Sequence, residues 1–233
     1  MATDSHHLRK LAAGTCLTAA PILLLASAVT SPKLDMDGAD QLALVSAHAD
    51  RWFISQVLGL AALALFVPAV MGLIHMLRER QVLAGFIGGG LTLLGALAAI
   101  AATGASMVMW EMAKPGIDSG AMSALATRLT DSTGLILAIF VPTICLAIGM
   151  LVLAFGLFRA HVVPAPSAIA LAVGAICLVL GYGALGSIAF VIAGSAFMLV
   201  GMMSIGWNVL TESDEAWEHT PQFSGFRPAG GMR

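Results

Sequence analysis

The chain has 233 residues, of which 59% are hydrophobic and only 10% are charged, and its mean hydropathy is +0.94. Soluble domains carry about 25% charged residues, so this composition excludes an ordinary water-soluble surface. The formal net charge of −2 gives no basis for binding nucleic acid. We therefore expect an integral membrane protein whose main partner is the lipid bilayer.

Five long stretches contain no Asp, Glu, Lys or Arg: residues 11–32, 52–77, 81–110, 132–158 and 162–211. A helix needs roughly 20 apolar residues to cross a bilayer core of about 30 Å. The first four stretches are long enough for one crossing each, and the fifth is long enough for two. The sequence therefore predicts an all-α bundle with six spans. The expected spans are residues 11–31, 52–77, 82–110, 132–158, 165–184 and 187–210. They make a single membrane domain over residues 1–211, followed at 212–233 by an acidic and then Gly/Pro-rich tail.

The first span resembles a signal peptide in part. Arg9 and Lys10 precede it, and Ala26-Ser27-Ala28 is similar to a signal-peptidase site. Signal-peptide apolar regions are typically about 7–15 residues long, which is shorter than this run. We therefore expect the first span to be retained; cleavage would leave five spans.

The Lys and Arg residues predict the sidedness of the spans, because short cytoplasmic loops carry an excess of both. The Arg78-Glu79-Arg80 turn is typical of a short cytoplasmic connection, so we expect both termini in the cytoplasm. Five basic residues then lie inside: Arg9, Lys10, Arg78, Arg80 and Arg159. Four lie outside: Lys33, Arg51, Lys114 and Arg128.

Two longer connections, residues 33–51 and 112–131, face outward in this topology. Both contain apolar residues at helical spacing, such as Leu42 and Val45 in the first and Met122, Leu125 and Leu129 in the second. We expect short outer helices that lie on the membrane surface. A lid over a cavity between the spans is the alternative.

Small residues predict where the helices touch, because helices in lipid associate through close backbone approach. Gly85 and Gly89 have GxxxG spacing, and Gly95 continues the third span. Gly194 and Gly201 belong to a run spaced by seven, the period of a left-handed seam. We interpret these five glycines as helix-packing residues; a substrate path or an oligomer face along the sixth span is the alternative.

Two prolines interrupt spans at similar places. Pro68 and Pro142 each follow a Phe-Val pair, in the second and fourth spans. A proline inside a helix removes one backbone hydrogen bond, so we expect a kink at each. Interrupted spans in matched positions also indicate a transport site where a chain is internally duplicated, although the match here is only three residues long.

No ionisable residue lies at mid-depth in any predicted span, which argues against a proton-coupled pump. We expect the polar side chains there, among them Thr92, Thr103 and Ser106, to form hydrogen bonds between helices. No catalytic or cofactor-binding residue is predicted, and the chain has no CxxC pair.

The densest polar chemistry is on the predicted outer face. Asp35, Asp37 and Asp40 surround a glycine in a pattern similar to the start of a calcium loop. Position 12 of that loop is Ser46 rather than the required glutamate, so we interpret the run as a solvated acidic turn. The alternative is a metal or acid–base site formed by these aspartates with other outer residues: His48, Asp50, Glu111, Asp118 and Asp131.

The chain resembles six-helix integral membrane proteins of high-GC, actinobacterial-type bacteria. The similar pieces are the run from Gln56 to Leu60 leading to Pro68, the Trp110-Glu111 helix end, and Trp207 before an acidic tail. The resemblance implies a bacterial plasma membrane and no activity or cofactor.

Three hypotheses of function follow. The first is a non-enzymatic accessory or scaffolding component that packs against other membrane subunits or against itself. The second is a small transporter or channel for an apolar or weakly polar solute. The third is a membrane enzyme with an outer-face site of histidine and carboxylate side chains.

Overall fold

The structure is a computed structural model of the whole chain, and it describes residues 5–32, 38–116, 118–214 and 217. Within these ranges the chain is helical and has no strand, so the predicted all-α class is confirmed. The helices are α1 (Ser5–Thr30), α2 (Gly38–Ala47), α3 (Ala49–Leu77), α4 (Val82–Met112), α5 (Ser119–Thr130), α6 (Thr133–Ala160), α7 (Ala165–Val179) and α8 (Ile188–Thr211). A π-helical turn, η1 (Leu180–Ala184), extends α7.

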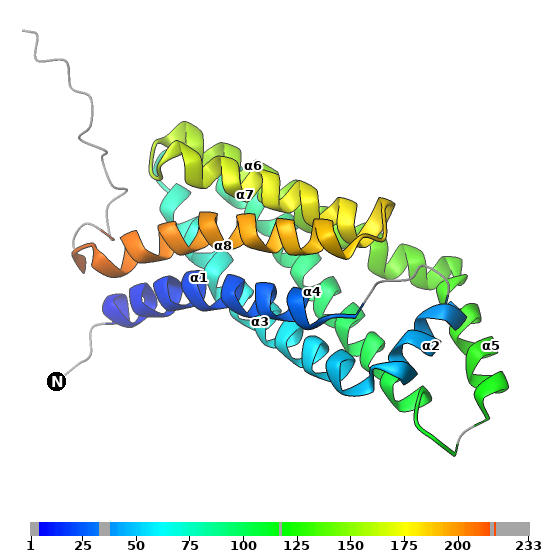
Figure 1. Cartoon of the computed structure of the whole chain (residues 1–233). Helices are drawn as coiled ribbons and strands as arrows, with labels where there is room; N and C mark the ends of the chain where they lie inside the picture. The colour runs from blue at the N-terminus through cyan, green and yellow to red at the C-terminus, as the bar shows by residue number, and fades with distance from the viewer. Residues whose placement is uncertain (1–4, 33–37, 117, 215–216, 218–233) are drawn as a thin grey trace, which may run out of the picture.

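Six long helices form a closed ring (Figure 1). Around the ring α1 packs against α3, α3 against α4, α4 against α6, α6 against α7 and α7 against α8. The last helix, α8, returns to lie beside the first, α1, and α3 also contacts α6 across the ring. Helices α2 and α5 lie together at the end of the bundle opposite to the start of α1.

Five helices of the described residues are long and apolar enough to cross a membrane: His7–Thr30, Ala49–Leu77, Val82–Met112, Ala165–Gly183 and Ile188–Thr211. Each includes at least 19 residues, which at about 1.5 Å per residue nearly matches the hydrocarbon thickness. The predicted membrane setting is therefore supported by five helices. In the sixth, α6, the described apolar part is Ile144–Ala160, which is shorter.

The centre of the ring is filled by large apolar side chains that every long helix except α4 supplies. They are inaccessible to solvent, at 0–1% exposure: Leu17, Leu73, Leu77, Met150, Leu153, Leu157, Leu171, Met198, Met202 and Ile205. The outward faces carry equally apolar residues, such as Leu83 and Phe86, which are 74% and 78% exposed. Apolar side chains both inside and outside are what a bundle in lipid requires.

Helices α4 and α6 approach each other backbone to backbone. A Cβ atom at Gly95 would meet the backbone nitrogen of Leu146, and one at Gly149 would meet the backbone nitrogen of Thr92. A Cβ atom at Gly88 would lie 2.9 Å from the backbone nitrogen of Leu153. These distances leave no room for a side chain, so the two backbones touch.

The other predicted packing glycines also lie between helices. Gly194 and Gly201 face α7, with carbonyl oxygens of α7 3.0 Å from a Cβ built at either position. Gly85 and Gly89 face α3 instead, and Gly89 lies against the side chain of Ile74. The GxxxG pair and Gly95 therefore serve two different neighbours of α4.

Two serines join α1 to α3 by reciprocal hydrogen bonds. Ser27 Oγ donates to the carbonyl of Ser55 at 2.8 Å, and Ser55 Oγ donates to the carbonyl of Ser27 at 3.0 Å. Both serines are buried, and Gly59 next to them lets the helices approach. Ser27 belongs to the segment similar to a signal-peptidase site, and here it is part of a helix interface.

The polar side chains of α4 are bonded within their own helix. Thr92, Thr103 and Ser106 each donate to the carbonyl four residues earlier, at 2.7–2.9 Å. The expectation that they form bonds between helices is wrong, because the nearest free carbonyl lone pair is on the same helix.

Helices α2 and α5 form a small second cluster on the end of α4. Leu42 of α2, Met112 of α4 and Ala126 of α5 are buried together. A Cβ atom at Gly38 would lie 2.6 Å from the carbonyl oxygen of Ala126, so the start of α2 needs glycine for its close approach. The short helices predicted in both connections are therefore present and pack on one another.

Pro68 lies within the continuous helix α3, and position 142 lies within α6. The side chain of Pro142 lies outside the described residues, and the predicted kinks remain predictions.

The backbone contact between α4 and α6 predicts a difference between two glycines of one helix. Gly95→Ala puts a methyl group into the backbone of Leu146 and should destabilise the protein by about 1–3 kcal/mol. Gly90→Ala has nothing within 4 Å of the new atom, so its unfolding temperature should stay near that of the parent. Thermal unfolding in detergent measures both, and equal effects would contradict the packing described.

Candidate functional site

The outer-face residues that the sequence singles out have local structural roles. Asp118 caps α5, because its Oδ1 accepts from the backbone nitrogens of Gly120 and Ala121 at 2.9 and 3.2 Å. Glu111 pairs with Lys114 at 2.8 Å. Such a cap stabilises a helix end, and such an exposed pair contributes little.

The remaining outer candidates are spread along the helix ends. His48 and Asp50 begin α3, Asp40 lies in the first turn of α2, and Asp131 ends α5. Asp35 and Asp37 lie outside the described residues. In the part of the chain that is described, no three His, Cys, Asp or Glu residues are grouped so that they would hold a metal ion.

The opposite end of the bundle holds a denser polar site, which we call the terminal cluster: His7, Lys10, His75, Asp214 and Trp217. Lys10 is 5% exposed although it is a lysine. Its Nζ donates to Asp214 Oδ1 at 2.7 Å and to the backbone carbonyl of Glu212 at 2.6 Å. His7 Nδ1 lies 3.0 Å from the other oxygen of Asp214. The cluster thus joins the start of α1 to the segment after α8.

His75, at the end of α3, contacts the same segment through Trp217. The two rings stack with centroids 4.8 Å apart, and His75 Nε2 lies 3.3 Å from the carbonyl oxygen of Trp217. Nη1 of Arg78 lies 3.2 Å from His75 Nδ1. Because a guanidinium group only donates hydrogen bonds, His75 Nδ1 is the acceptor of the Arg78 hydrogen bond. Nε2 therefore carries the hydrogen and donates a hydrogen bond to the carbonyl oxygen of Trp217.

The electrostatics of the cluster favour the ion pair between Lys10 and Asp214 at neutral pH. The hydrogen bond from Lys10 lowers the pKa of Asp214, with a further contribution from His7. Burial raises the pKa of Glu212, and the charge of Lys10 acts in the opposite direction. The carboxylate of Asp214 is therefore the natural counter-ion of the buried ammonium.

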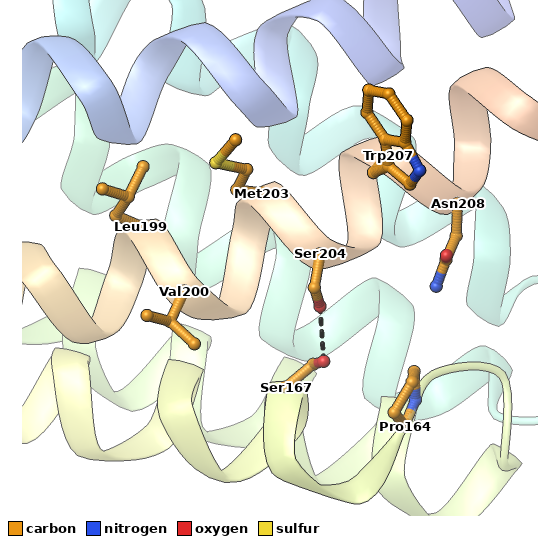
Figure 2. A pocket seen from close by; sticks show the side chains of 8 residues that line it. All are labelled: Pro164, Ser167, Leu199, Val200, Met203, Ser204, Trp207 and Asn208. Carbon is orange, nitrogen blue, oxygen red and sulfur yellow. Dashed lines mark hydrogen bonds between the residues drawn. The ribbon is translucent and has the colours of Figure 1, made fainter.

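A lateral groove of about 640 Å³ runs along α8 (Figure 2). Two rows of side chains at intervals of four residues line it. One row is Leu199, Met203 and Trp207, and the other is Val200, Ser204 and Asn208. Pro164, directly before α7, and Ser167 of α7 close one side, where the hydroxyls of Ser167 and Ser204 are hydrogen-bonded. The groove is apolar along most of its length, and Asn208 and Trp207 lie at its polar end.

Sequence reasoning did not find the terminal cluster. Lys10 and Asp214 are 204 positions apart, and His75 and Trp217 are 142 apart. The available signal was the pairing of basic residues before the first span with acidic residues directly after the last. Searches against protein families, curated proteins and solved structures find no match to this chain.

The burial of Lys10 predicts unequal effects for its two neutralising substitutions. Asp214→Asn leaves a buried ammonium without a counter-ion, whereas Lys10→Met leaves a half-exposed carboxylate that water solvates. Asp214→Asn should therefore lower the unfolding temperature more than Lys10→Met. Thermal unfolding of both variants and of the double variant tests this order, and the reverse order would show that the burial of Lys10 is unimportant.

The lowered pKa of Asp214 predicts an acid-sensitive contribution to stability. Because the folded-state pKa lies below the ordinary value of 3.8, the contribution is complete above that value and is lost as pH falls through the folded pKa. The difference in unfolding temperature between the parent and Asp214→Asn should therefore shrink as the pH is lowered below about 4. A difference that stays constant or grows below about pH 4 would contradict the assignment.

Proposed function

We propose that the protein is a non-enzymatic, multi-pass scaffold of a bacterial plasma membrane, with six spans and both termini in the cytoplasm. The sixth span is α6, which is 28 residues long and packs between α4 and α7 in the ring. A ring member of that length, flanked by spanning helices on both sides, is expected to share their environment.

The distribution of charge supports the proposed sidedness. The end that carries the terminal cluster has five basic residues in the described part, Arg9, Lys10, Arg78, Arg80 and Arg159. The end that carries α2 and α5 has three there, Arg51, Lys114 and Arg128. Since cytoplasmic ends carry more Lys and Arg, the first end is assigned to the cytoplasm.

The proposal rests on the contrast between the ring's centre, which apolar side chains fill, and its side, where a groove runs along α8. Apolar side chains occupy the middle of the ring, and α4 touches α6 backbone to backbone. A solute path needs polar lining groups and space, which this packing does not favour. The groove on α8 is open to the surroundings, and Val200 and Trp207 in its lining are each 62% exposed.

The shape of the groove fits a helix. Its walls are two rows of side chains four residues apart, and a ridge of a second helix packs between such rows. Ser204 is small and lies midway along the groove, which permits close approach of a neighbouring backbone. We therefore assign the groove to a transmembrane helix of a neighbouring subunit, either another protein or a second copy of this chain.

Site-specific photocrosslinking tests this assignment in native membranes. A photoreactive residue at Val200, which lines the groove and is 62% exposed, should form a discrete protein adduct. The matched control is Ile169 on α7, which is 58% exposed and outside the groove. It should give no discrete protein adduct.

Filling the groove provides the second arm of this test. Val200→Trp should abolish the assembly seen by size measurement in mild detergent, and Ile169→Trp should preserve it. A clean monomer for the parent chain, or lipid as the only adduct at Val200, would overturn the scaffold proposal.

A further inference from the structure

The two partners of the terminal ion pair differ in how firmly they are held. Lys10 lies near the start of α1 and is 5% exposed. Asp214 lies beyond the end of α8, where Glu212 has already left helical geometry at φ −70° and ψ 155°. The side chain of Asp214 is 51% exposed. The cation is therefore fixed and buried, while the anion sits on a short segment outside the bundle.

This asymmetry restricts how the pair can open. A buried ammonium without a counter-ion is strongly unfavourable, so simple departure of the carboxylate is opposed. Departure becomes favourable when another anion takes its place on Lys10 Nζ and His7 Nδ1. Lys10 and His7 thus form an anion site that the chain fills with its own carboxylate.

The position of the site indicates which anion competes. It lies at the basic end of the bundle, beside Arg9 and Arg78, at the level where the spans end. Basic residues directly next to spans attract anionic phospholipids electrostatically. Trp217 is an indole at the same level, which is typical of the headgroup region.

We propose that an anionic phospholipid headgroup exchanges with Asp214 on Lys10 and thereby releases Trp217 from His75. This inference rests on the membrane placement proposed above and not on the scaffold role. Trp217 follows Asp214 by three residues, and its backbone nitrogen donates to the carbonyl of Ser213 at 3.1 Å. The segment is thus held at two nearby points, by Asp214 on Lys10 and by Trp217 on His75. Loss of the contact to Lys10 lowers the effective concentration of Trp217 near His75 and so weakens the second contact.

Fluorine NMR of the full chain labelled with 5-fluorotryptophan tests the exchange. The four tryptophans give four signals, which single Trp→Phe variants assign. The protein is reconstituted in nanodiscs of zwitterionic phosphatidylcholine or of phosphatidylcholine mixed with anionic phosphatidylglycerol. We expect the Trp217 signal to move in the anionic bilayer to the position that Asp214→Asn gives in the zwitterionic one. The signals of Trp52 and Trp110, at the other end of the bundle, should stay in place.

The controls separate the exchange from a general effect of surface charge. Lys10→Met should abolish the dependence of the Trp217 signal on lipid charge, while Asp118→Asn, which removes a carboxylate at the opposite end, should retain it. A Trp217 signal that is identical in both bilayers, while Asp214→Asn differs, would overturn the proposal. An equal response in Lys10→Met would do so too. Movement caused by inorganic phosphate in the zwitterionic bilayer would assign the site to soluble anions and overturn the headgroup assignment.

Discussion

The structure depends on contact between helix backbones. In lipid there is no hydrophobic gain when one apolar helix leaves its surroundings to join another, so association relies on dispersion forces at short range. Two helix backbones come close enough only where no side chain separates them. Glycine allows this approach where α4 meets α6 and where α7 meets α8. The large core residues then fill the space that these contacts define.

The ring is closed by contacts between its first and last helices, α1 and α8, which are neighbours in space and distant in sequence. Gly14 of α1 lies against Leu210 of α8, and the carbonyl oxygen of Gly14 lies 3.0 Å from a Cβ built at Gly206. The terminal cluster adds polar contacts just beyond this interface, where Lys10 meets Glu212 and Asp214. Packing brings the two helices together, and the ion pair links the start of α1 to the residues after α8.

Much of the architecture follows from the sequence alone, because a helix that crosses lipid must be a long stretch without charged residues. Charge-free stretches locate the long helices to within about six residues. Which helices pack against each other is harder to predict from the sequence. The GxxxG residues Gly85 and Gly89 turn toward α3, whereas Gly95 turns toward α6, because a helix of 31 residues presents different faces to different neighbours. The terminal cluster escaped prediction since no local pattern links residues so far apart.

Polar groups are arranged so that the bundle interior needs no water. The hydroxyls of α4 donate hydrogen bonds to carbonyl oxygens of their own helix. Ser27 and Ser55 each donate to the other's backbone carbonyl across the interface of α1 and α3. Each such hydroxyl is neutral and donates a hydrogen bond to a backbone carbonyl, so its donor is satisfied without water. Among the described residues, the charged side chains lie near the two ends of the bundle, and Lys10 is the buried one. Lys10 is therefore a buried cation that ties the start of α1 to the residues directly after α8.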